Sequence, residues 1–294
     1  MSTPGAWTKA TPAPAHMLGH VLRPDELLRH SRYDHAEPAP ALRRWVERYW
    51  SVTWQLPPGQ ERVASTLDDP GIHLTHEWGG VRRAGAGGAG DWITGPVARG
   101  RFDVTQHGAG GVVGVRFRLG GTTAFTTAAP SEIRDRTVRA ADWFRRGDLV
   151  LPDLPDLPDT ATAAATAFDS WLLALEPREA PGFAEFTQIL GLLDDPAVTG
   201  TAELERRSGH GTRTLQRRFH RFLGVGPKRM ILRARVIDAV AAIDRGDRRS
   251  LGELAHDLGW YDQPHFDRDF RAVTGTAPSA YARTAAVRGP ILGL

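Results

Sequence analysis

Two spacings of apolar residues divide the chain. Residues 49–56 alternate with a period of two, which predicts a β-strand. Similar short runs follow at residues 72–78, 91–94, 102–106 and 112–118, and glycine and proline separate them. Several short strands at such spacing predict a compact β-sandwich or barrel within residues 38–118.

Helical patterns dominate the rest of the chain. Residues 130–144 and 161–176 each predict a helix, and a threefold Leu-Pro-Asp repeat at 151–159 predicts an extended connector. From residue 183 onward we expect short helices and no strand. The fold class is therefore α+β with two domains, a β-rich barrel or sandwich with helices followed by an all-α domain. The predicted boundaries are a flexible tail at 1–36, the β-rich domain at 37–177, a linker at 178–182, the helical domain at 183–284 and a tail at 285–294.

The composition of the 294 residues excludes several chemistries. Apolar residues make up 41% and charged residues 24%, which is typical of globular proteins. The absence of cysteine excludes a disulfide framework, a thiolate zinc site and a thiol nucleophile. Residues 1–15 lack the features of a signal peptide, and no apolar run approaches the roughly 18 residues of a membrane span. We therefore expect a soluble, cytoplasmic protein that does not bind membranes.

Positive charge is concentrated in the last third. The net charge is +3 overall, −1 for residues 1–182 and +4 for residues 183–294. Residues 205–235 contain ten basic side chains and one acid, Glu205. Such a segment favours a polyanionic partner, although a solvated helix face or the chain's general preference for arginine over lysine are alternatives.

An internal repeat lies in the same region. Seven positions recur in order, at an offset of 50 residues up to the first glycine of each unit and 51 residues after it. They are Leu204, Gly209, Leu215, Arg217, Phe219, Gly224 and Pro227 in the first unit, and Leu254, Gly259, Phe266, Arg268, Phe270, Gly275 and Pro278 in the second.

Each unit predicts a helix, a turn and a second helix. Gly209 and Gly259 can end the first helices in the left-handed conformation, and Asp262 is a good N-cap for the last helix, whereas Gly211 is a weaker one. Between the units, residues 227–244 predict one helix about 27 Å long, since each residue adds 1.5 Å. That length could hold two recognition helices near the roughly 34 Å repeat of successive major grooves.

The core positions define which side chains face outward. Leu215, Phe219 and Phe222 form the inner stripe of the first unit's second helix, and Phe266, Phe270 and Val273 that of the second unit's. The faces left outside carry Arg213, Gln216, Arg217 and His220 in one unit, and Gln263, Pro264, His265 and Arg268 in the other. Arginine can read guanine and glutamine can read adenine in the major groove, while other arginines grip phosphates.

Residues 183–283 resemble the paired helix-turn-helix domain of the AraC/XylS family of bacterial transcription regulators. The signature runs from Gly259 to Arg271, followed by Gly275, Pro278 and Tyr281, and residues 215–219 and 224–227 match the first unit. The resemblance implies base contacts from Arg213, Gln216 and Arg217 in one groove, and from Pro264, His265 and Arg268 in the other. To the DNA backbone we assign Thr212, Arg218, Arg221, Lys228, Arg229, Gln263 and Arg271.

Three features depart from the family pattern. Glu205 stands where a small residue is usual, and Pro264 where a polar residue is common. Residues 250–283 have a net charge of −2, so we expect the first unit to supply most of the phosphate affinity. A helical domain that binds protein is the alternative for the repeat, because fold alone does not define function.

The N-terminal part resembles, more loosely, the β-rich sensor halves of some regulators of this family. The matching segments are residues 49–52, 69–71, 95–97 and 114–117. The resemblance implies an effector-binding or dimerisation role. An apolar effector pocket could be lined by aromatic side chains, although an ordinary packed core would use the same residues. The candidates are Trp50, Trp54, Trp78, Trp92 and Phe102.

A metal site in this β-rich part is the main enzymatic alternative. His73, His76, Glu77 and His107 lie in neighbouring β segments, and these residue types suit zinc, iron or nickel. However, a spacing of three places His73 and His76 on opposite faces of a regular strand. No nucleophile elbow, P-loop or Rossmann glycine pattern occurs, and residues 85–90 predict a hairpin tip. We therefore expect no metal, no cofactor and no catalysed reaction.

Together these observations predict a sequence-specific DNA-binding transcription regulator that responds to an effector through its N-terminal domain. The expected partner is double-stranded DNA. A small-molecule effector, contact with RNA polymerase and a homodimer are further partners that this interpretation allows. The alternative is a metal-binding or enzymatic β-barrel with an appended helical module for DNA or protein.

Overall fold

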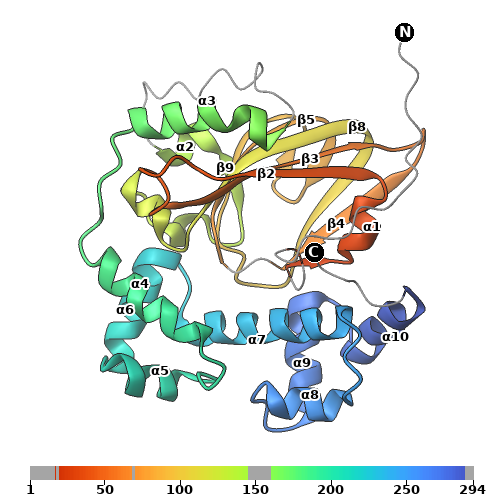
Figure 1. Ribbon diagram of the computed structural model, residues 1–294, viewed down its shortest axis with the longest axis vertical. Helices are drawn as coiled ribbons and strands as arrows, with labels where there is room; N and C mark the ends of the chain where they lie inside the picture. The colour runs from red at the N-terminus through yellow and green to blue at the C-terminus, as the bar shows by residue number, and fades with distance from the viewer. Residues whose placement is uncertain (1–16, 18–19, 68–69, 145–159, 289–294) are drawn as a thin grey trace.

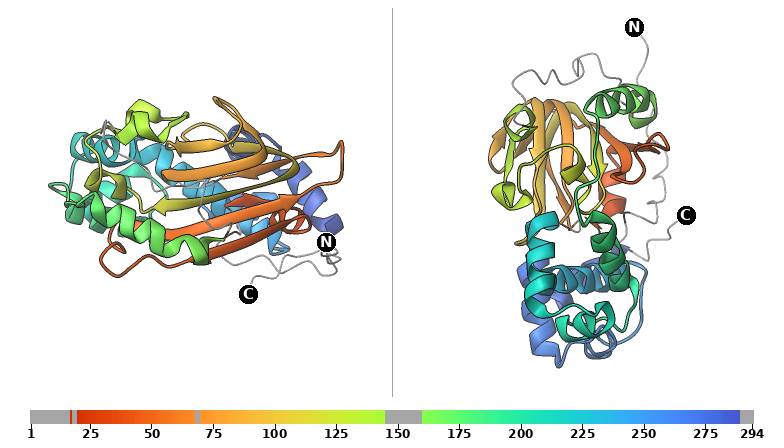
Figure 2. Two further views of the ribbon diagram at one scale, coloured as in Figure 1. Left: turned by 90° about the horizontal axis from the view of Figure 1, so that it is seen from above. Right: turned by 90° about the vertical axis from the view of Figure 1, so that its left-hand side faces the viewer.

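The computed structural model describes residue 17 and residues 20–67, 70–144 and 160–288. A sheet with covering helices forms one layer, and a row of helices forms the other (Figure 1). The second view of Figure 2 shows the helical layer beneath the sheet. This confirms the α+β class and the two-domain order. The predicted connector at 151–159 lies outside the described residues.

The described residues of the N-terminal domain form nine strands in one antiparallel sheet. The long strand β8 (Phe102–Phe117) pairs along one edge with β4 (Glu61–Thr66) and then with β3 (Val46–Gln55), and along its other edge with β5 (His73–Arg83). Beyond β5 lie β6 (Ala86–Gly87), β7 (Gly90–Thr94) and β9 (Thr137–Arg139). On the opposite side of the sheet, β2 (Ser31–Ala36) pairs with β3, and β1 (Val21–Leu22) pairs with β4. No pairing between described strands joins the outer edges, so the sheet stays open and is not a closed barrel.

The prediction of separate strands at 102–106 and 112–118 was wrong, because β8 is continuous through the glycines between them. A Cβ at Gly110 would lie 2.7 Å from the Trp54 ring, and one at Gly111 would lie 2.2 Å from the Trp78 ring. The glycines therefore leave room for indole rings of neighbouring strands and do not end the strand.

The prediction of one helix at 130–144 was also wrong. The segment forms a 3-10 turn, η3 (Pro130–Ile133), then β9, then the short helix α2 (Ala140–Phe144). Asp135 has a left-handed backbone with φ of 57°. Its carboxylate accepts hydrogen bonds from the backbone N–H groups of Ala98 and Arg99 at 2.7 and 2.8 Å. This tertiary contact holds the backbone in a conformation that no helix allows.

Two predicted tails are shorter than expected. Residues 21–36 form β1, α1 (Pro24–Leu28) and β2, and the six residues of β2 pair with β3. The polar composition of β2 gives no apolar alternation from which a strand could be predicted. One of its polar residues, Asp34, accepts hydrogen bonds from Thr162 at 2.8 and 3.1 Å. At the other end, α10 (Pro278–Arg288) extends into the segment predicted to be a tail from residue 285.

Helix α3 (Ala161–Ala174) covers the face of the sheet that points away from the helical domain (Figure 1). Phe168 and Leu172 pack there against Tyr49, Leu74 and Val115, all nearly inaccessible to solvent. The Tyr49 hydroxyl donates a hydrogen bond to Asp169 at 2.5 Å. This core fixes the N-terminal domain as a folded unit.

The C-terminal domain is helical throughout, as predicted. It begins with α4 (Phe183–Gly191) and η5 (Leu192–Asp194). The first unit consists of α5 (Thr201–Ser208) and α6 (Thr212–Leu223), and the second of α8 (Leu251–Asp257) and α9 (Gln263–Thr274). Between them, α7 spans Pro227–Asp244, the bounds expected from the sequence. None of the described helices combines the length and the hydropathy that crossing a membrane requires.

The two domains are in direct contact along α7. Arg233, 2% exposed, donates a hydrogen bond to the Gly100 carbonyl at 2.8 Å, and Arg229 donates one to the Ala98 carbonyl at 2.9 Å. Leu67 of the N-terminal domain lies in the same core cluster as Val236 and Val240 of α7. Helix α7 is therefore buried by the helix-turn-helix units and also by the loop at residues 95–101.

Candidate nucleic-acid interface

The first candidate recognition helix is α6, which begins after Gly211 and ends at Gly224. Gly224 takes the left-handed conformation with φ of 69°, and its N–H bonds to the His220 carbonyl. Leu215, Phe219 and Phe222 are buried, each 1% exposed or less. This leaves the three residues assigned to base contacts exposed, and none of their side chains has a hydrogen bond or ion pair with any described residue. They are Arg213, Gln216 and Arg217.

The second candidate recognition helix, α9, is capped as the sequence predicts. The Asp262 carboxylate accepts a hydrogen bond from the His265 N–H at 2.8 Å, and Pro264 lies in the first turn. Pro264, His265 and Arg268 are exposed. Arg268 has no described partner, whereas His265 Nε2 lies 3.2 Å from the Asp269 carboxylate.

The spacing of the two units is fixed through Arg235 of α7. Its Nε donates to the Leu258 carbonyl at 2.6 Å, and its Nη1 donates to the Thr199 carbonyl at 3.4 Å. Its guanidinium carbon lies 3.8 Å from the centroid of the Trp260 ring. Burial lowers the pKa of Arg235, although Asp269 opposes this shift. One side chain thus holds together the segment before α5 and the turn before α9, which places α6 and α9 at opposite ends of α7 (Figure 1).

Three of the residues assigned to the DNA backbone already have partners within the protein. The Thr212 hydroxyl donates to Glu205 at 2.7 Å, Arg218 donates to Glu185 at 2.6 Å, and Arg229 is bound to Ala98. The side chains of the others are exposed and form no hydrogen bond or ion pair with described residues. They are Arg221, Lys228, Gln263 and Arg271.

Glu205 has a structural role at the position where the family usually has a small residue. By accepting a hydrogen bond from the Thr212 hydroxyl, the Glu205 carboxylate joins α5 to the first turn of α6. The helix N-cap at Gly211 offers no side chain for this purpose. The departure from the family pattern therefore compensates for a weak cap.

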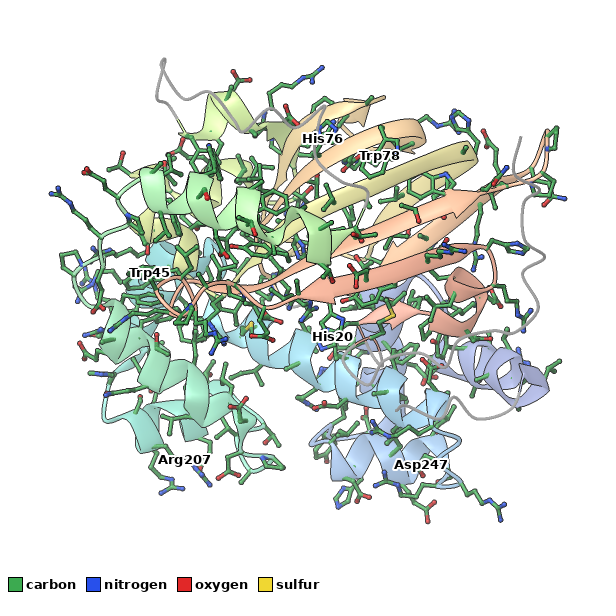
Figure 3. The ribbon with its side chains drawn as sticks, turned by 45° about the horizontal axis from the view of Figure 1, so that its top comes forward. His20, Trp45, His76, Trp78, Arg207 and Asp247 are labelled. Carbon is green, nitrogen blue, oxygen red and sulfur yellow. The ribbon has the colours of Figure 1, made fainter. Side chains whose placement is uncertain are left out.

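The positive charge of the first unit is partly neutralised. Arg206 and Arg207 both pair with Glu203, and their hydrogen bonds lower the pKa of its carboxyl to about 2. Glu203 lies two residues before the basic segment counted from the sequence, so that count overstated the available charge. Arg207 and the acidic residue Asp247 lie on the two lobes of the domain that point away from the sheet (Figure 3).

Tyr261 is an exposed aromatic residue beside α9 that the sequence analysis treated only as part of the signature. It is 93% exposed, unlike the neighbouring Trp260, which is 2% exposed. The N-cap Asp262 follows directly, so the Tyr261 ring lies at the start of the recognition helix. The sequence alone does not show which of these two adjacent aromatic residues is exposed; the structure shows that it is Tyr261.

The N-terminal domain contains a cavity of about 160 Å³ on the inner side of the sheet. Trp50, Trp54 and Phe102 line it, whereas Trp78 and Trp92 do not. Trp78 stacks on His76 at 5.8 Å on the other face of β5 (Figure 3), and Trp92 lies beneath Arg139, 4.1 Å from its guanidinium carbon. Polar residues also line the cavity. Arg48, Thr75 and Gln106 were not among the candidates from the sequence, whereas Glu77 was a candidate only for a metal site.

The histidines of the proposed metal site occupy different surroundings. His73 lines the cavity, whereas His76 is on the opposite face of β5 and its Nδ1 lies 2.7 Å from Asp91. His107 is in β8, where it pairs in register with Glu61 of β4. Across the described ranges, no three histidine, aspartate or glutamate side chains converge in a group that could hold a metal ion.

Two helix-turn-helix units joined by one helix, each with an exposed polar face on its second helix, define a paired helix-turn-helix DNA-binding domain. Residues 204–284 match the family described as "Helix-turn-helix domain". This domain is of the AraC type, which confirms the resemblance seen in the sequence. Residues 34–139 match a second family, described as "Domain of unknown function (DUF6597)".

Two of the solved structures that match this chain come from bacteria. An AraC-type transcriptional regulator from Chromobacterium violaceum is 22% identical, covering 38% of this chain and 100% of that chain, with a TM-score of 0.32. ToxT from Vibrio cholerae is 10% identical, covering 80% of this chain and 98% of its own, with a TM-score of 0.42. Among curated proteins, no match to this sequence was found. The AraC-type assignment therefore applies to residues 204–284.

Proposed function

We propose that this protein is a sequence-specific DNA-binding transcription regulator that reads two successive major grooves with α6 and α9. The observation that supports this most strongly is the contrast between the two sides of α6 and of α9. The inner side of each helix is buried, whereas the outer sides carry Arg213, Arg217 and Arg268, whose side chains are exposed and have no partner among the described residues. Exposed arginines on a rigid helix suit bidentate contacts to guanine.

The residues divide into those that read bases and those that bind phosphate. In this proposal Arg213, Gln216 and Arg217 read one groove, and Pro264, His265 and Arg268 read the other. Thr212, Arg221, Lys228, Gln263 and Arg271 contact the backbone, and Tyr261 joins them. Arg218 and Arg229 contribute only if DNA displaces Glu185 and Ala98 from them.

The proposal extends to control by a small molecule. The cavity lined by Trp50, Trp54 and Phe102 also contacts Val97, which belongs to the loop that supports α7. A ligand in the cavity could therefore alter the domain contact and the DNA-binding domain. In the same proposal the protein works in the cytoplasm, catalyses no reaction, acts on transcription through RNA polymerase and forms a homodimer.

Selection of randomised duplexes by the purified full-length protein tests the proposed function. We expect an enriched sequence with two half-sites separated by about one helical turn, 10–10.5 base pairs, because α7 holds the recognition helices apart. An Arg178→Ala variant serves as the control, since the Arg178 side chain is 87% exposed in the segment between the two domains and its loss should leave the selected sequence unchanged. Failure to enrich any sequence, together with capture of a protein by the helical domain, would support the protein-binding alternative.

A further inference from the structure

A second cavity lies at the edge of the N-terminal domain, beside the loop at residues 95–101. Its volume is about 510 Å³, within the range of small-molecule sites. Five arginines and two aspartates are among the residues that line it, which gives the lining a net charge of +3. We call it the arginine cleft after its cationic residues, which are Arg82, Arg83, Arg99, Arg101 and Arg136.

Arg83 supplies the strongest indication of a ligand. Its side chain is 2% exposed, and its Nη1 pairs with Glu77. Its Nε and Nη2 are also buried, and neither has a hydrogen-bond partner in the described part of the chain. These two nitrogens form one edge of the guanidinium, with parallel N–H groups that match a carboxylate or phosphate bidentately.

The surroundings of Arg83 do not satisfy that edge. The Trp92 ring centroid lies 5.5 Å from the Arg83 guanidinium carbon, but a ring face takes up none of the in-plane N–H groups. Leaving the buried donors of a charged group unpaired is costly, more so than for a neutral group. An oxyanion in the cleft would remove this cost.

The acidic residues of the cleft are already occupied. Asp103 pairs with Arg101, and Asp135 accepts the backbone N–H groups of Ala98 and Arg99. The Arg99 guanidinium forms no hydrogen bond or ion pair with a described residue, so it remains available, whereas the Thr94 and Thr137 hydroxyl groups bond to each other at 3.2 Å. Donors therefore outnumber free acceptors.

The cleft adjoins the contact between the domains. The Ala98 and Gly100 carbonyls accept hydrogen bonds from Arg229 and Arg233 of α7. On the same loop, Arg101 donates to the Thr274 carbonyl at the end of α9, at 2.9 Å. A ligand that attracts Arg99 and Arg101 would thus act on the segment that supports both recognition helices.

We propose that the arginine cleft binds a small organic oxyanion, which places a carboxylate or phosphate group on the free edge of Arg83 and further negative oxygens near Arg99 and Arg136. The arginine cleft is separate from the surface proposed to bind DNA. Anion binding in the cleft therefore does not depend on the proposed DNA-binding function. The cavity lined by Trp50, Trp54 and Phe102 shares Thr94, Val97 and Phe102 with the arginine cleft. A nonpolar part of the ligand can therefore extend from the cleft toward that cavity.

Calorimetric titration of the full-length protein with citrate and, separately, with pyrophosphate tests this proposal at constant ionic strength without DNA. We expect saturable binding of at least one anion at one site per chain, and the preferred anion distinguishes carboxylate from phosphate ligands. Arg83→Lys keeps a cation beside Glu77 but removes the bidentate edge, so affinity should fall about tenfold or more. Arg99→Ala, at an exposed position, should also weaken binding.

The control is Arg178→Ala, which removes the same charge as Arg99→Ala from an exposed position between the two domains. It should leave the affinity unchanged. The proposal is overturned if neither anion binds the wild-type protein, if Arg83→Lys and Arg99→Ala bind as the wild type does, or if Arg178→Ala weakens binding as much as they do. Thermal unfolding of each variant shows whether it is folded. If Arg83→Lys does not fold, the Arg99→Ala variant alone tests the proposal.

Discussion

Replacing Gly224 with alanine should lower the free energy of unfolding in two ways, through the left-handed backbone and through the contact between the domains. Gly209 provides a matched comparison in which only the backbone contributes. Both glycines end the first-unit helices with φ of 69°. A Cβ at Gly209 meets no atom within 4 Å. A Cβ at Gly224 would lie 2.7 Å from the Ser131 nitrogen and 2.8 Å from the Pro130 carbonyl carbon.

The structure gives the expected magnitudes. Gly209→Ala should lower the free energy of unfolding by about 1–2 kcal/mol, the cost of a left-handed backbone with a side chain. Gly224→Ala has the same backbone cost and must in addition displace the backbone of η3, which adds about 1–3 kcal/mol by analogy with overpacked cores. The second variant should also weaken the hydrogen bond from Arg134 to the Gly224 carbonyl, 3.2 Å long.

Urea unfolding of both variants, together with amide hydrogen exchange, measures this difference. We expect Gly224→Ala to be the less stable variant and to show faster exchange at residues 97–101 and 130–136. Equal costs, with unchanged exchange at these residues in both variants, would refute the contact between α6 and the N-terminal domain.

Three further predictions concern the cap, the charge and the pH dependence of the helical domain. Asp262→Ala should lower the free energy of unfolding by about 1 kcal/mol in urea titration, because the His265 N–H loses its acceptor, whereas Gln263→Ala should change it less. DNA affinity should fall with salt at a log–log slope near −5 if about six phosphates are contacted, and a slope near zero would contradict the electrostatic part of the account. The Glu203 carboxyl should titrate near pH 2 by NMR, against a usual 4.5, so its contribution to stability is present above pH 4.5 and is lost as the pH falls toward 2. Arg206→Ala should raise this pKa, and a wild-type value near 4.5 would disprove the ion pair.

The helical domain could be predicted well from the sequence because its signals are local. Gly209, Gly224, Gly259 and Gly275 all have positive φ at helix ends, and the apolar period fixes which face is buried. The bounds of α7 follow from Pro227 at its start and from the apolar period along its length.

The remaining features depend on residues far away in the sequence. The glycines of β8 suggested an interruption, although they accommodate Trp54 and Trp78 from other strands. The partners that occupy Arg218 and Arg229 lie 33 and 131 residues away, so no local pattern could reveal them. Arg83 likewise attracts notice only when its burial and its unpaired edge are known.

The most direct test of the central claim is the base preference of Arg217→Ala and Arg268→Ala, each selected on randomised duplexes beside the wild-type protein. Both side chains are exposed and have no described partner, so the variants should fold normally. Each should lose about 1–3 kcal/mol of affinity for the wild-type site and relax the preference at one base-pair position. The two affected positions should lie about one helical turn apart, because α6 and α9 enter successive grooves. Unchanged affinity and base preference in both variants would contradict the assignment of these helices to the major groove.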